Sequence, residues 1–484
     1  MNYRMIIYIT GQILRVEGLL MLPGMFCGLF YREPTSRAFL IPAAAAILLG
    51  TLATLKKPSD TAIFAREGFV TVGISWMLLS AFGALPFVIS GEIPSFTDAF
   101  FETVSGFTTT GATILTNVEG LSRGMLFWRS FTHWIGGMGV LVFVLAILPQ
   151  ADTRSVKLMH VMRAEVPGPK VGKLVSKISR TARITYGIYI ALTALQVIFL
   201  LAGGMPLFDS LINSFGTAGT GGFGIWNNSI AHYDSAYVDW VIGIFMFLFG
   251  INFNLYYFLL IGKVGEALKS EELRWYLLIV AGSTALIAFD VRDLYGGFGE
   301  SLRYSFFQVS SIISTTGFST CDFDKWHELS KLVLVLLMFC GSCAGSTCGG
   351  LKVGRLILLV KSGLREIKYM LHPRAVVPVR SEGKPVDNDT LRSASSYLVV
   401  FVMLFTASFF LIEAVEECDL VTGFTAVSAC LNNVGPGLGK VGPMGSFSWM
   451  SGFSKWLLSF DMLAGRLEIF PLLMVFAPRT WRRR

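Results

Sequence analysis

The chain has 484 residues, of which 53% are hydrophobic and 15% are charged, whereas a soluble domain carries about 25% charged residues. Its mean hydropathy is +0.61. These values exclude an ordinary soluble domain and indicate a protein that crosses a membrane several times. The net charge of +8 does not indicate a nucleic-acid-binding protein, because the basic residues lie in a few short connections rather than in a basic and aromatic stripe.

Ten apolar runs are candidates for membrane-spanning helices, because about 20 apolar residues cross the hydrocarbon core of a bilayer. We therefore predict an all-α polytopic membrane protein with ten transmembrane spans. The runs lie near residues 5–31, 38–55, 69–90, 124–149, 184–204, 237–262, 275–291, 331–360, 394–415 and 453–478.

The basic residues predict the orientation of the chain in the membrane. Segments 151–183 and 355–392 each contain eight Lys or Arg residues, and the sequence ends in Trp-Arg-Arg-Arg. Such segments remain on the cytoplasmic side by the positive-inside rule. With an even number of spans, both termini should then be cytoplasmic. The two basic segments are also the expected docking surface for a regulatory partner, although they could simply enforce the topology.

Four segments rich in Gly, Ser and Thr lie between pairs of apolar runs. They are too polar to face lipid and too apolar for ordinary loops, so we predict that they are re-entrant. Non-helical backbone at membrane depth is tolerated only where protein or a water-filled cavity surrounds it. The segments are 95–118, 207–230, 299–322 and 419–444.

The four segments align on one glycine each, which indicates an internal repeat of span, pore segment and span. A small residue stands six positions before the glycine in every copy: Ser105, Gly216, Ser311 and Ala429. The aligned sequences are Thr109-Thr110-Gly111-Ala112, Thr220-Gly221-Gly222-Phe223, Thr315-Thr316-Gly317-Phe318 and Asn433-Val434-Gly435-Pro436. The predicted division is a two-span unit at 1–66 and four pore repeats at 67–160, 161–272, 273–370 and 371–484.

Glycine-centred strands suit a path for cations. Backbone carbonyls can replace the water of an ion without introducing a full charge, and glycine allows the dihedral angles that point carbonyls inward. We therefore predict that four strands form one ring that binds a cation. The candidate ion-binding residues are Thr109, Thr110, Gly111, Thr220, Gly221, Gly222, Thr315, Thr316, Gly317, Asn433, Val434 and Gly435.

The sequence also resembles a known family. The motifs TTTGAT, TGGFG, STTGFST and LNNVGPGLG are similar to those of the Trk/Ktr/HKT superfamily of potassium transporters. The two additional N-terminal spans, HPRAV at 372–376 and GRLEIF at 465–470 resemble the TrkH/TrkG branch of bacterial membrane subunits. The resemblance covers essentially the whole chain.

This resemblance implies potassium uptake across the bacterial inner membrane by a homodimer with no cofactor of its own. It also implies a cytoplasmic nucleotide-binding regulatory subunit of the TrkA type. In the superfamily, glycine at all four aligned positions goes with potassium, and serine in the first segment favours sodium. Gly221 in the second segment and Asn433-Val434 in the fourth depart from the Thr-Thr-Gly pattern, so the ring should be only pseudo-fourfold and could also admit rubidium or sodium.

Two features are candidates for a gate. The stretch from Cys340 to Lys352 contains four glycines and two serines, which should break a helix. Close helix packing by small residues is the alternative. The resemblance implies an intramembrane gating loop at this place. The residues assigned to it are Cys343, Ala344, Gly345, Ser346, Thr347, Gly349, Gly350 and Lys352.

The second candidate is Arg466, which lies inside the last apolar run. An arginine at membrane depth is costly and points to a function. A structural ion pair with Asp461 or Glu468 is the alternative. The resemblance implies that this arginine approaches the ion path and raises the barrier to cations when the pore is shut.

Two mechanisms remain open from the sequence. The first is a gated, channel-like pore for potassium uptake, and the second is a symporter that couples potassium obligatorily to sodium or protons. An enzyme is not expected, because no clustered constellation of His, Asp and Cys residues is visible.

Overall fold

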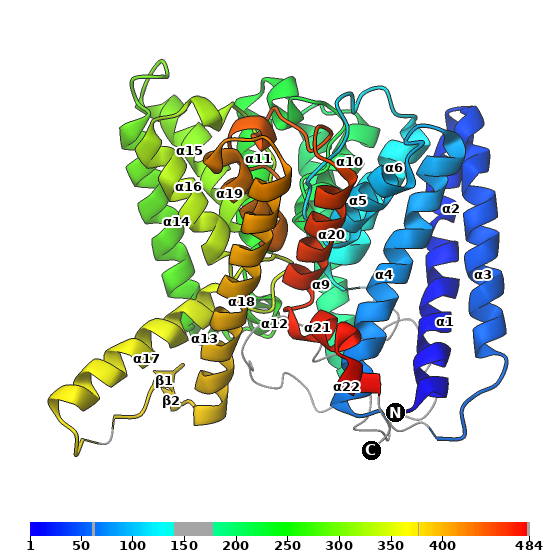
Figure 1. The fold of residues 1–484 in the computed structure, drawn as a ribbon. Coiled ribbons are helices and arrows are strands. Elements are labelled where there is room, and N and C mark those ends of the chain that lie inside the picture. Colours follow the sequence, from blue (N-terminus) through cyan, green and yellow to red (C-terminus); the bar gives the residue numbers. More distant parts are fainter. Residues whose placement is uncertain (61–62, 140–177, 376, 482–484) are drawn as a thin grey trace.

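The structure is a computed structural model that describes residues 1–60, 63–139, 178–375 and 377–481. The described chain is a bundle of helices with one short β-hairpin (Figure 1). Most of the predicted basic segment 151–183, the end of the predicted run 124–149 and the last three residues lie outside the described residues.

The N-terminal helices pack side by side at one edge of the bundle, drawn in dark blue in Figure 1. A Cβ atom on Gly11 of the first helix would lie 3.0 Å from the carbonyl oxygen of Gly50 in the third. Small residues at such a contact let two membrane helices approach closely. The elements are α1 (Tyr3–Leu20), α2 (Leu22–Phe30), η1 (Pro34–Phe39) and α3 (Leu40–Thr54).

The remaining helices include four short ones of 12 to 16 residues that lie in the upper half of Figure 1. These short helices are α5 (Phe96–Phe107), α10 (Leu207–Gly219), α15 (Phe298–Ile313) and α19 (Leu420–Leu431). All residues of α5 from Ala99 to Phe107 are buried, and so are the last seven residues of α19. Helices buried on all sides belong to the interior of a bundle rather than to its lipid-facing surface.

The other elements surround the short helices or connect them. In the first half they are α4 (Ala65–Ser90), α6 (Arg123–Gly137), α9 (Ile178–Ala202), η2 (Ser229–Tyr233), α11 (Ala236–Phe249), α12 (Phe253–Leu260) and α13 (Val264–Leu268). In the second half they are α14 (Glu271–Asp290), η3 (Phe323–Lys325), α16 (Glu328–Cys340), α17 (Val353–Leu371), β1 (Arg380–Ser381), β2 (Lys384–Pro385), α18 (Asn388–Val415), η4 (Gly439–Val441), α20 (Gly452–Arg466), α21 (Phe470–Phe476) and α22 (Pro478–Trp481). The two strands pair antiparallel, with Arg380 opposite Pro385.

Six helices of the described chain are long and apolar enough to cross a membrane, and a bent pair makes a seventh. The outer helix α18 leaves Val402, Met403 and Phe410 exposed, as a lipid-facing helix should. The chain is therefore a multi-pass membrane protein. The count of ten spans stays a prediction.

The run 237–262, predicted as one span, consists of two helices with a sharp bend between them. Helices α11 and α12 meet at 94°, with the break between Phe249 and Phe253. Asn252 caps the new helix, because its side-chain oxygen accepts the N–H of Asn254 at 2.9 Å. The break also leaves the carbonyl of Gly250 without a partner in its own helix, and this carbonyl accepts a hydrogen bond from the N–H of Cys343.

The last apolar run, 453–478, is also broken, between α20 and α21. Glu468 and Ile469 there have φ angles of 55° and 61°, values that no residue of a right-handed helix adopts. Arg466 lies within this run, as predicted, and is the last residue of α20. At a helix end its side chain can reach backbone carbonyls of neighbouring segments.

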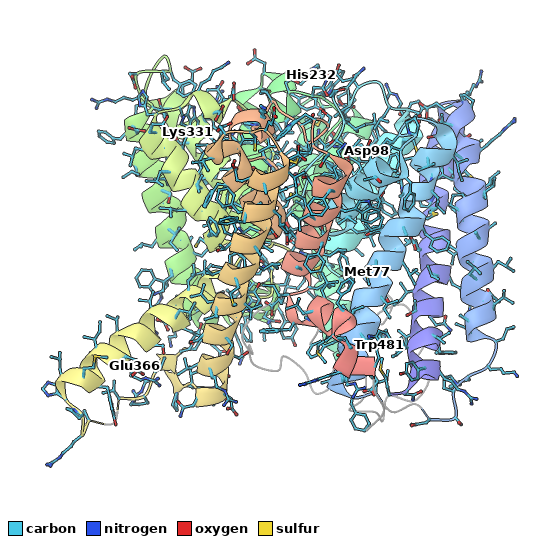
Figure 2. All side chains as sticks on the ribbon, in the orientation of Figure 1. Met77, Asp98, His232, Lys331, Glu366 and Trp481 are labelled. Atoms are coloured by element: carbon cyan, nitrogen blue, oxygen red, sulfur yellow. The ribbon has the colours of Figure 1, made fainter. Side chains whose placement is uncertain are left out.

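The first and last helices meet at one end of the bundle. The rings of Tyr3 and Trp481 stack at 6.3 Å, and the Tyr3 hydroxyl donates to the Trp481 carbonyl at 2.8 Å. Figure 2 labels Trp481 at the lower end of the view and Asp98 near the upper end. The first turn of α5, which contains Asp98, thus lies at the end of the bundle opposite to α22 and the N-terminus (Figure 1).

Candidate functional site

The four short helices end in the same hydrogen-bonded turn. In each, the residue before the aligned glycine donates its N–H to the carbonyl of the small residue six positions before that glycine. This is the six-to-one bond of a Schellman motif, which closes a helix C-terminus. The pairs are Thr110 to Ser105 at 2.9 Å, Gly221 to Gly216 at 2.9 Å, Thr316 to Ser311 at 2.8 Å and Val434 to Ala429 at 2.8 Å.

The backbone beyond each turn also repeats. Two positions before the glycine, a non-glycine residue has a left-handed conformation, which is uncommon and costly for a β-branched residue such as Thr. The φ angles are 54° at Thr109, 55° at Thr220, 55° at Thr315 and 56° at Asn433. The glycines have φ angles of 82° at Gly111, 76° at Gly222, 81° at Gly317 and 100° at Gly435. The same strained geometry at four places means that the surrounding fold imposes it.

The four glycines form a closed cycle of contacts. A Cβ atom added to any one of them would collide with the carbonyl oxygen of the residue before the next glycine in the cycle. The collisions are of Gly111 with Gly221, of Gly222 with Thr316, of Gly317 with Val434 and of Gly435 with Thr110. The last contact joins the fourth segment to the first, so the four strands lie around one axis. Because the partners are backbone atoms, only glycine fits at these positions.

The electrostatics of the short helices are alike. Each begins with an acidic residue, in the first turn at Asp98, Asp209 and Glu300 and at the N-cap at Asp419. Hydrogen bonds from Thr422 lower the pKa of the Asp419 carboxyl, which keeps it ionised at the positive end of α19. The opposite, partially negative ends of the helices point at the ring of strands, where they favour a cation.

The second strand has Gly221 where the Thr-Thr-Gly pattern has a second threonine, because the imidazole of His133 lies against this position. A Cβ atom on Gly221 would overlap the imidazole of His133, which is fully buried on α6. The Nδ1–H of His133 donates to the carbonyl of Gly106 at 2.7 Å, which fixes the ring behind the strands. The sequence did not reveal this role, because Gly106 and Gly221 are distant from His133 along the chain.

The fourth strand departs from the pattern because its Asn433 makes contacts that threonine could not. Its side-chain amide donates to the hydroxyl of Thr110 at 3.0 Å and to the carbonyl of Met462 in α20 at 2.9 Å. It therefore links the fourth strand to the first strand and to α20.

The segment between α16 and α17, residues 341–352, lies against the third and fourth strands. We call it the intramembrane loop. The N–H of Gly349 donates to the hydroxyl of Thr315 at 2.8 Å, and a Cβ atom on Gly349 would collide with the carbonyl of Asn432. The helix break predicted at Cys340–Lys352 is thus present, and the loop is packed against two of the strands of the ring.

The bend between α11 and α12 also contacts the intramembrane loop. The N–H of Cys343 donates to the freed carbonyl of Gly250 at 3.1 Å, and the N–H of Phe253 donates to the carbonyl of Gly345 at 3.1 Å. Non-helical backbone inside a membrane protein needs such partners, because no water is present to supply them. The bend and the loop therefore satisfy each other. Ser346 is bound within the loop, donating its hydroxyl to the Cys343 carbonyl at 2.6 Å.

Arg466 joins the loop to α6. Its guanidinium donates to the carbonyl of Thr347 at 2.7 Å, to that of Gly136 at 2.5 Å and to that of Gly137 at 2.8 Å. The side chain is 8% exposed, so these charge-assisted bonds lie in a largely dry place. Glu468, one of the two predicted partners of Arg466, pairs with Arg355 at 2.8 Å.

Two further side chains hold the two ends of the loop. Lys352 is buried and donates its ammonium to the carbonyl of Cys348. The carboxylate of Glu272, on α14, accepts the N–H of Ala344 and that of Gly354, both at 2.8 Å. Glu272 thus bridges the loop to the start of α17. Gly350 has a φ of 75° and crosses close to Gly341, as a tight loop requires.

A sequence profile of the TrkH family, whose description is "cation transport protein", matches residues 35–483. This chain belongs to the TrkH family. The family resemblance predicted from the sequence motifs is therefore confirmed, and the expectation of a transport protein rather than an enzyme agrees with it.

Relatives cover the whole chain. It is 37% identical to the Trk system potassium uptake protein TrkH of Salmonella typhimurium over all of both chains, and 35% identical to the Trk system potassium uptake protein TrkG of Escherichia coli over 99% of each. The crystal structure of the potassium transporter TrkH from Vibrio parahaemolyticus matches with a TM-score of 0.89 at 32% identity and covers all of both chains. The TrkH fold therefore extends over the full length.

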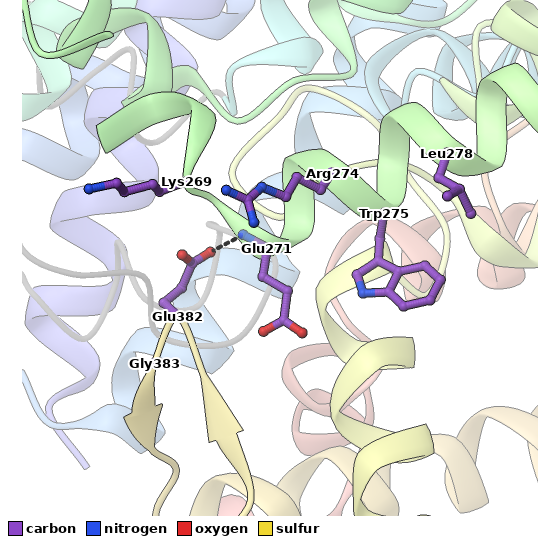
Figure 3. Close-up of a pocket in the computed structure, with 7 residues that line it drawn as sticks. All are labelled: Lys269, Glu271, Arg274, Trp275, Leu278, Glu382 and Gly383. Atoms are coloured by element: carbon purple, nitrogen blue, oxygen red, sulfur yellow. Dashed lines mark hydrogen bonds between the residues drawn. The ribbon is translucent and has the colours of Figure 1, made fainter. Parts of the chain in front are cut away.

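In this TrkH-family chain, the hairpin β1–β2 contacts the start of α14. Figure 3 shows the carboxylate of Glu382, at the tip of the hairpin, reaching the backbone N–H of Glu271 at 3.1 Å. The hydroxyl of Ser270 donates to the same carboxylate at 3.0 Å. A surface pocket opens beside this contact, and it is lined by Lys269, Glu271, Arg274, Trp275, Leu278, Glu382 and Gly383. The next residue of α14 is Glu272, whose carboxylate binds the intramembrane loop. The contact between the hairpin and Glu271 therefore lies beside Glu272 in the sequence.

The packing of His133 against Gly221 yields a prediction. Gly221→Ala should lower rubidium uptake by cells that depend on this protein by about tenfold, because the new methyl group and the imidazole cannot occupy the same space. Gly187→Ala is the matched control, since a Cβ atom there meets nothing within 4 Å. Uptake of Gly221→Ala equal to that of the control would show that the strand tolerates a side chain.

Proposed function

We propose that this chain is a potassium uptake transporter whose ion path runs along the axis of the four glycine-centred strands. The observation that supports this most directly is the closed cycle in which each glycine leaves room for the carbonyl of the next strand. A ring of carbonyl oxygens from four strands is the arrangement that binds a dehydrated monovalent cation. The filter residues would be the twelve candidates given by the sequence, with potassium as substrate and no cofactor.

Potassium is the expected ion for two reasons. The relatives with full-length similarity are potassium uptake proteins by name. In addition, all four aligned positions are glycine, which permits the closest approach of carbonyls around the axis. Rubidium should follow the same path, because its size is close to that of potassium, and sodium should be disfavoured.

The intramembrane loop is the proposed gate. It packs against the third and fourth strands through Gly349, and Arg466 fastens it to α6. The guanidinium also places a positive charge beside the loop, which would repel a cation as long as the loop is in place. All eight loop residues assigned from the sequence lie in this segment, and Lys352 closes its end.

The control of the gate is proposed to come from the end of the bundle that carries α22 and the hairpin. We assign this end to the cytoplasm of a bacterial cell, with both termini on that side, because the basic segment 355–392 includes the hairpin. A TrkA-type regulatory subunit binding there could move the hairpin, the start of α14 and Glu272, and so release the loop. Assembly as a homodimer in the inner membrane is part of the same proposal.

Obligatory symport is the less favoured alternative. It calls for an embedded carboxylate near the path. In the last apolar run, Asp461 is buried against the hydroxyl of Ser408 in α18 at 2.9 Å, and Glu468 pairs with Arg355. Both carboxylates therefore have partners that belong to the packing of helices.

Single-channel recording from the purified protein in bilayers distinguishes the two mechanisms. A gated pore predicts unitary currents that reverse at the potassium equilibrium potential, whatever the sodium and proton gradients. A reversal potential that shifts with either of those gradients, at fixed potassium, would establish coupling.

The filter assignment predicts the effect of a serine at the ring. Gly111→Ser and Gly317→Ser should each lower the ratio of rubidium to sodium uptake by about tenfold or more, since a side chain would displace the carbonyl of the next strand. Gly282→Ser on α14, where a Cβ atom meets nothing within 4 Å, is the control. An unchanged ratio in both filter variants would contradict the assignment.

The gate assignment predicts a gain of flux. Arg466→Ala, or deletion of residues 344–350, should raise the basal potassium flux of proteoliposomes several-fold in the absence of a regulatory partner. The loop would then lose its bonds to α6 or its contact with the strands. Arg292→Ala, at an arginine that lies over Phe289, serves as the control. Normal amounts of protein with no gain of flux would refute the gating role.

A further inference from the structure

A buried ion pair lies beside the first two strands of the ring. The carboxylate of Glu102, on α5, is 2.6 Å from the Nε of Arg129, on α6, and the two residues are 1% and 3% exposed. Removing two charges from water is costly unless further hydrogen bonds satisfy them. The other hydrogen bonds of Glu102 and Arg129 join them to the first and second strands of the ring.

Glu102 binds the first strand just beyond its glycine. The hydroxyl of Thr113 donates to both carboxylate oxygens, at 2.9 and 3.0 Å, and the N–H of Ile114 donates at 3.0 Å. These residues follow Gly111 by two and three positions. The carboxylate thus fixes the part of the first strand that leads away from the ring.

Arg129 binds the second strand at the corresponding place. Its Nη1 donates to the carbonyl of Gly224 at 3.1 Å, and its guanidinium carbon lies 3.5 Å from the centre of the Phe223 ring. These residues follow Gly222 directly. The pair is therefore a bridge from the first strand, through two buried charges, to the second strand.

The other segments place uncharged residues at the position of Glu102, nine before the glycine: Asn213, Gln308 and Ala426. The fourth segment fixes its strand with a neighbouring hydroxyl, because Thr425 accepts the N–H of Leu438 at 2.9 Å. Leu438 follows its glycine by three positions, as Ile114 does. The Thr425 contact holds one strand, whereas the Glu102–Arg129 bridge holds two at once.

We propose that Glu102 and Arg129 are positioning residues that set the separation of the first and second strands and thereby the preference for potassium over sodium. This inference rests on the proposed function of the ring. Neither residue contacts the ion. Two strands held apart by a bridge of short, charge-assisted bonds resist contraction of their carbonyls around a smaller ion.

Ratios of rubidium to sodium uptake test the proposal, because a purely structural role would lower both fluxes together. Glu102→Gln and Arg129→Lys should each lower the ratio by about fivefold or more, with the expression level of each variant measured alongside. Lysine keeps the positive charge but cannot bind Glu102 and Gly224 at the same time.

The double variant Glu102→Gln with Arg129→Gln distinguishes the loss of the bonds between the two strands from the effect of an unpaired buried charge. It contains no unpaired buried charge, so it should be better folded than Glu102→Gln alone. The ratio should nevertheless remain low, because the bonds between the two strands are lost. If the single variants do not fold, the uptake ratio of the double variant alone tests the proposal.

Asp239→Asn is the matched control. It breaks the pair between Asp239 and Arg303, 3.4 Å apart, which joins helices α11 and α15 rather than two strands. An uptake ratio equal to the wild-type value in both Arg129→Lys and the double variant would overturn the proposal. If Gly317→Ser lowers the ratio and these two variants do not, only the bridge is refuted; if none of them lowers it, the filter itself is refuted.

Discussion

The need to pair every backbone N–H and C=O inside an apolar bundle governs this structure. Four strands without regular secondary structure meet at its centre, where no bulk water can serve them. Their N–H groups turn back onto the four short helices, as that of Thr316 does onto Ser311. The carbonyls before the glycines are left to converge on an axis. Such carbonyls can replace the water around a dehydrated cation, which is the physical reason to read the site as an ion path.

One chain builds all four strands, so each has its own neighbours and the ring is not symmetric. The imidazole of His133 occupies the space that a side chain at position 221 would need. Asn433 links the fourth strand to the first, and the Glu102–Arg129 bridge joins the first strand to the second. The third and fourth strands instead meet the intramembrane loop. The first two strands are thus joined by a buried ion pair, whereas the third and fourth strands contact the segment proposed to move.

The sequence was most informative where a local pattern recurs. Gly111 and Gly317 could be aligned because Thr-Thr-Gly is written twice, and the aligned positions share hydrogen bonds and φ angles in the structure. It was least informative where a distant segment decides. The bend after Phe249 depends on the loop at Cys343, and the end of α20 at Arg466 depends on carbonyls of α6 and of the loop. Neither partner is near in sequence, and the apolar runs themselves read as continuous.

Crystals grown in rubidium, with anomalous scattering recorded at the rubidium absorption edge, test the central claim most directly. If the four strands form the ion path, an anomalous peak should lie on their axis, bounded by the carbonyls of Thr110, Gly221, Thr316 and Val434. Rubidium peaks confined to surface carboxylates, with none on that axis, would contradict it.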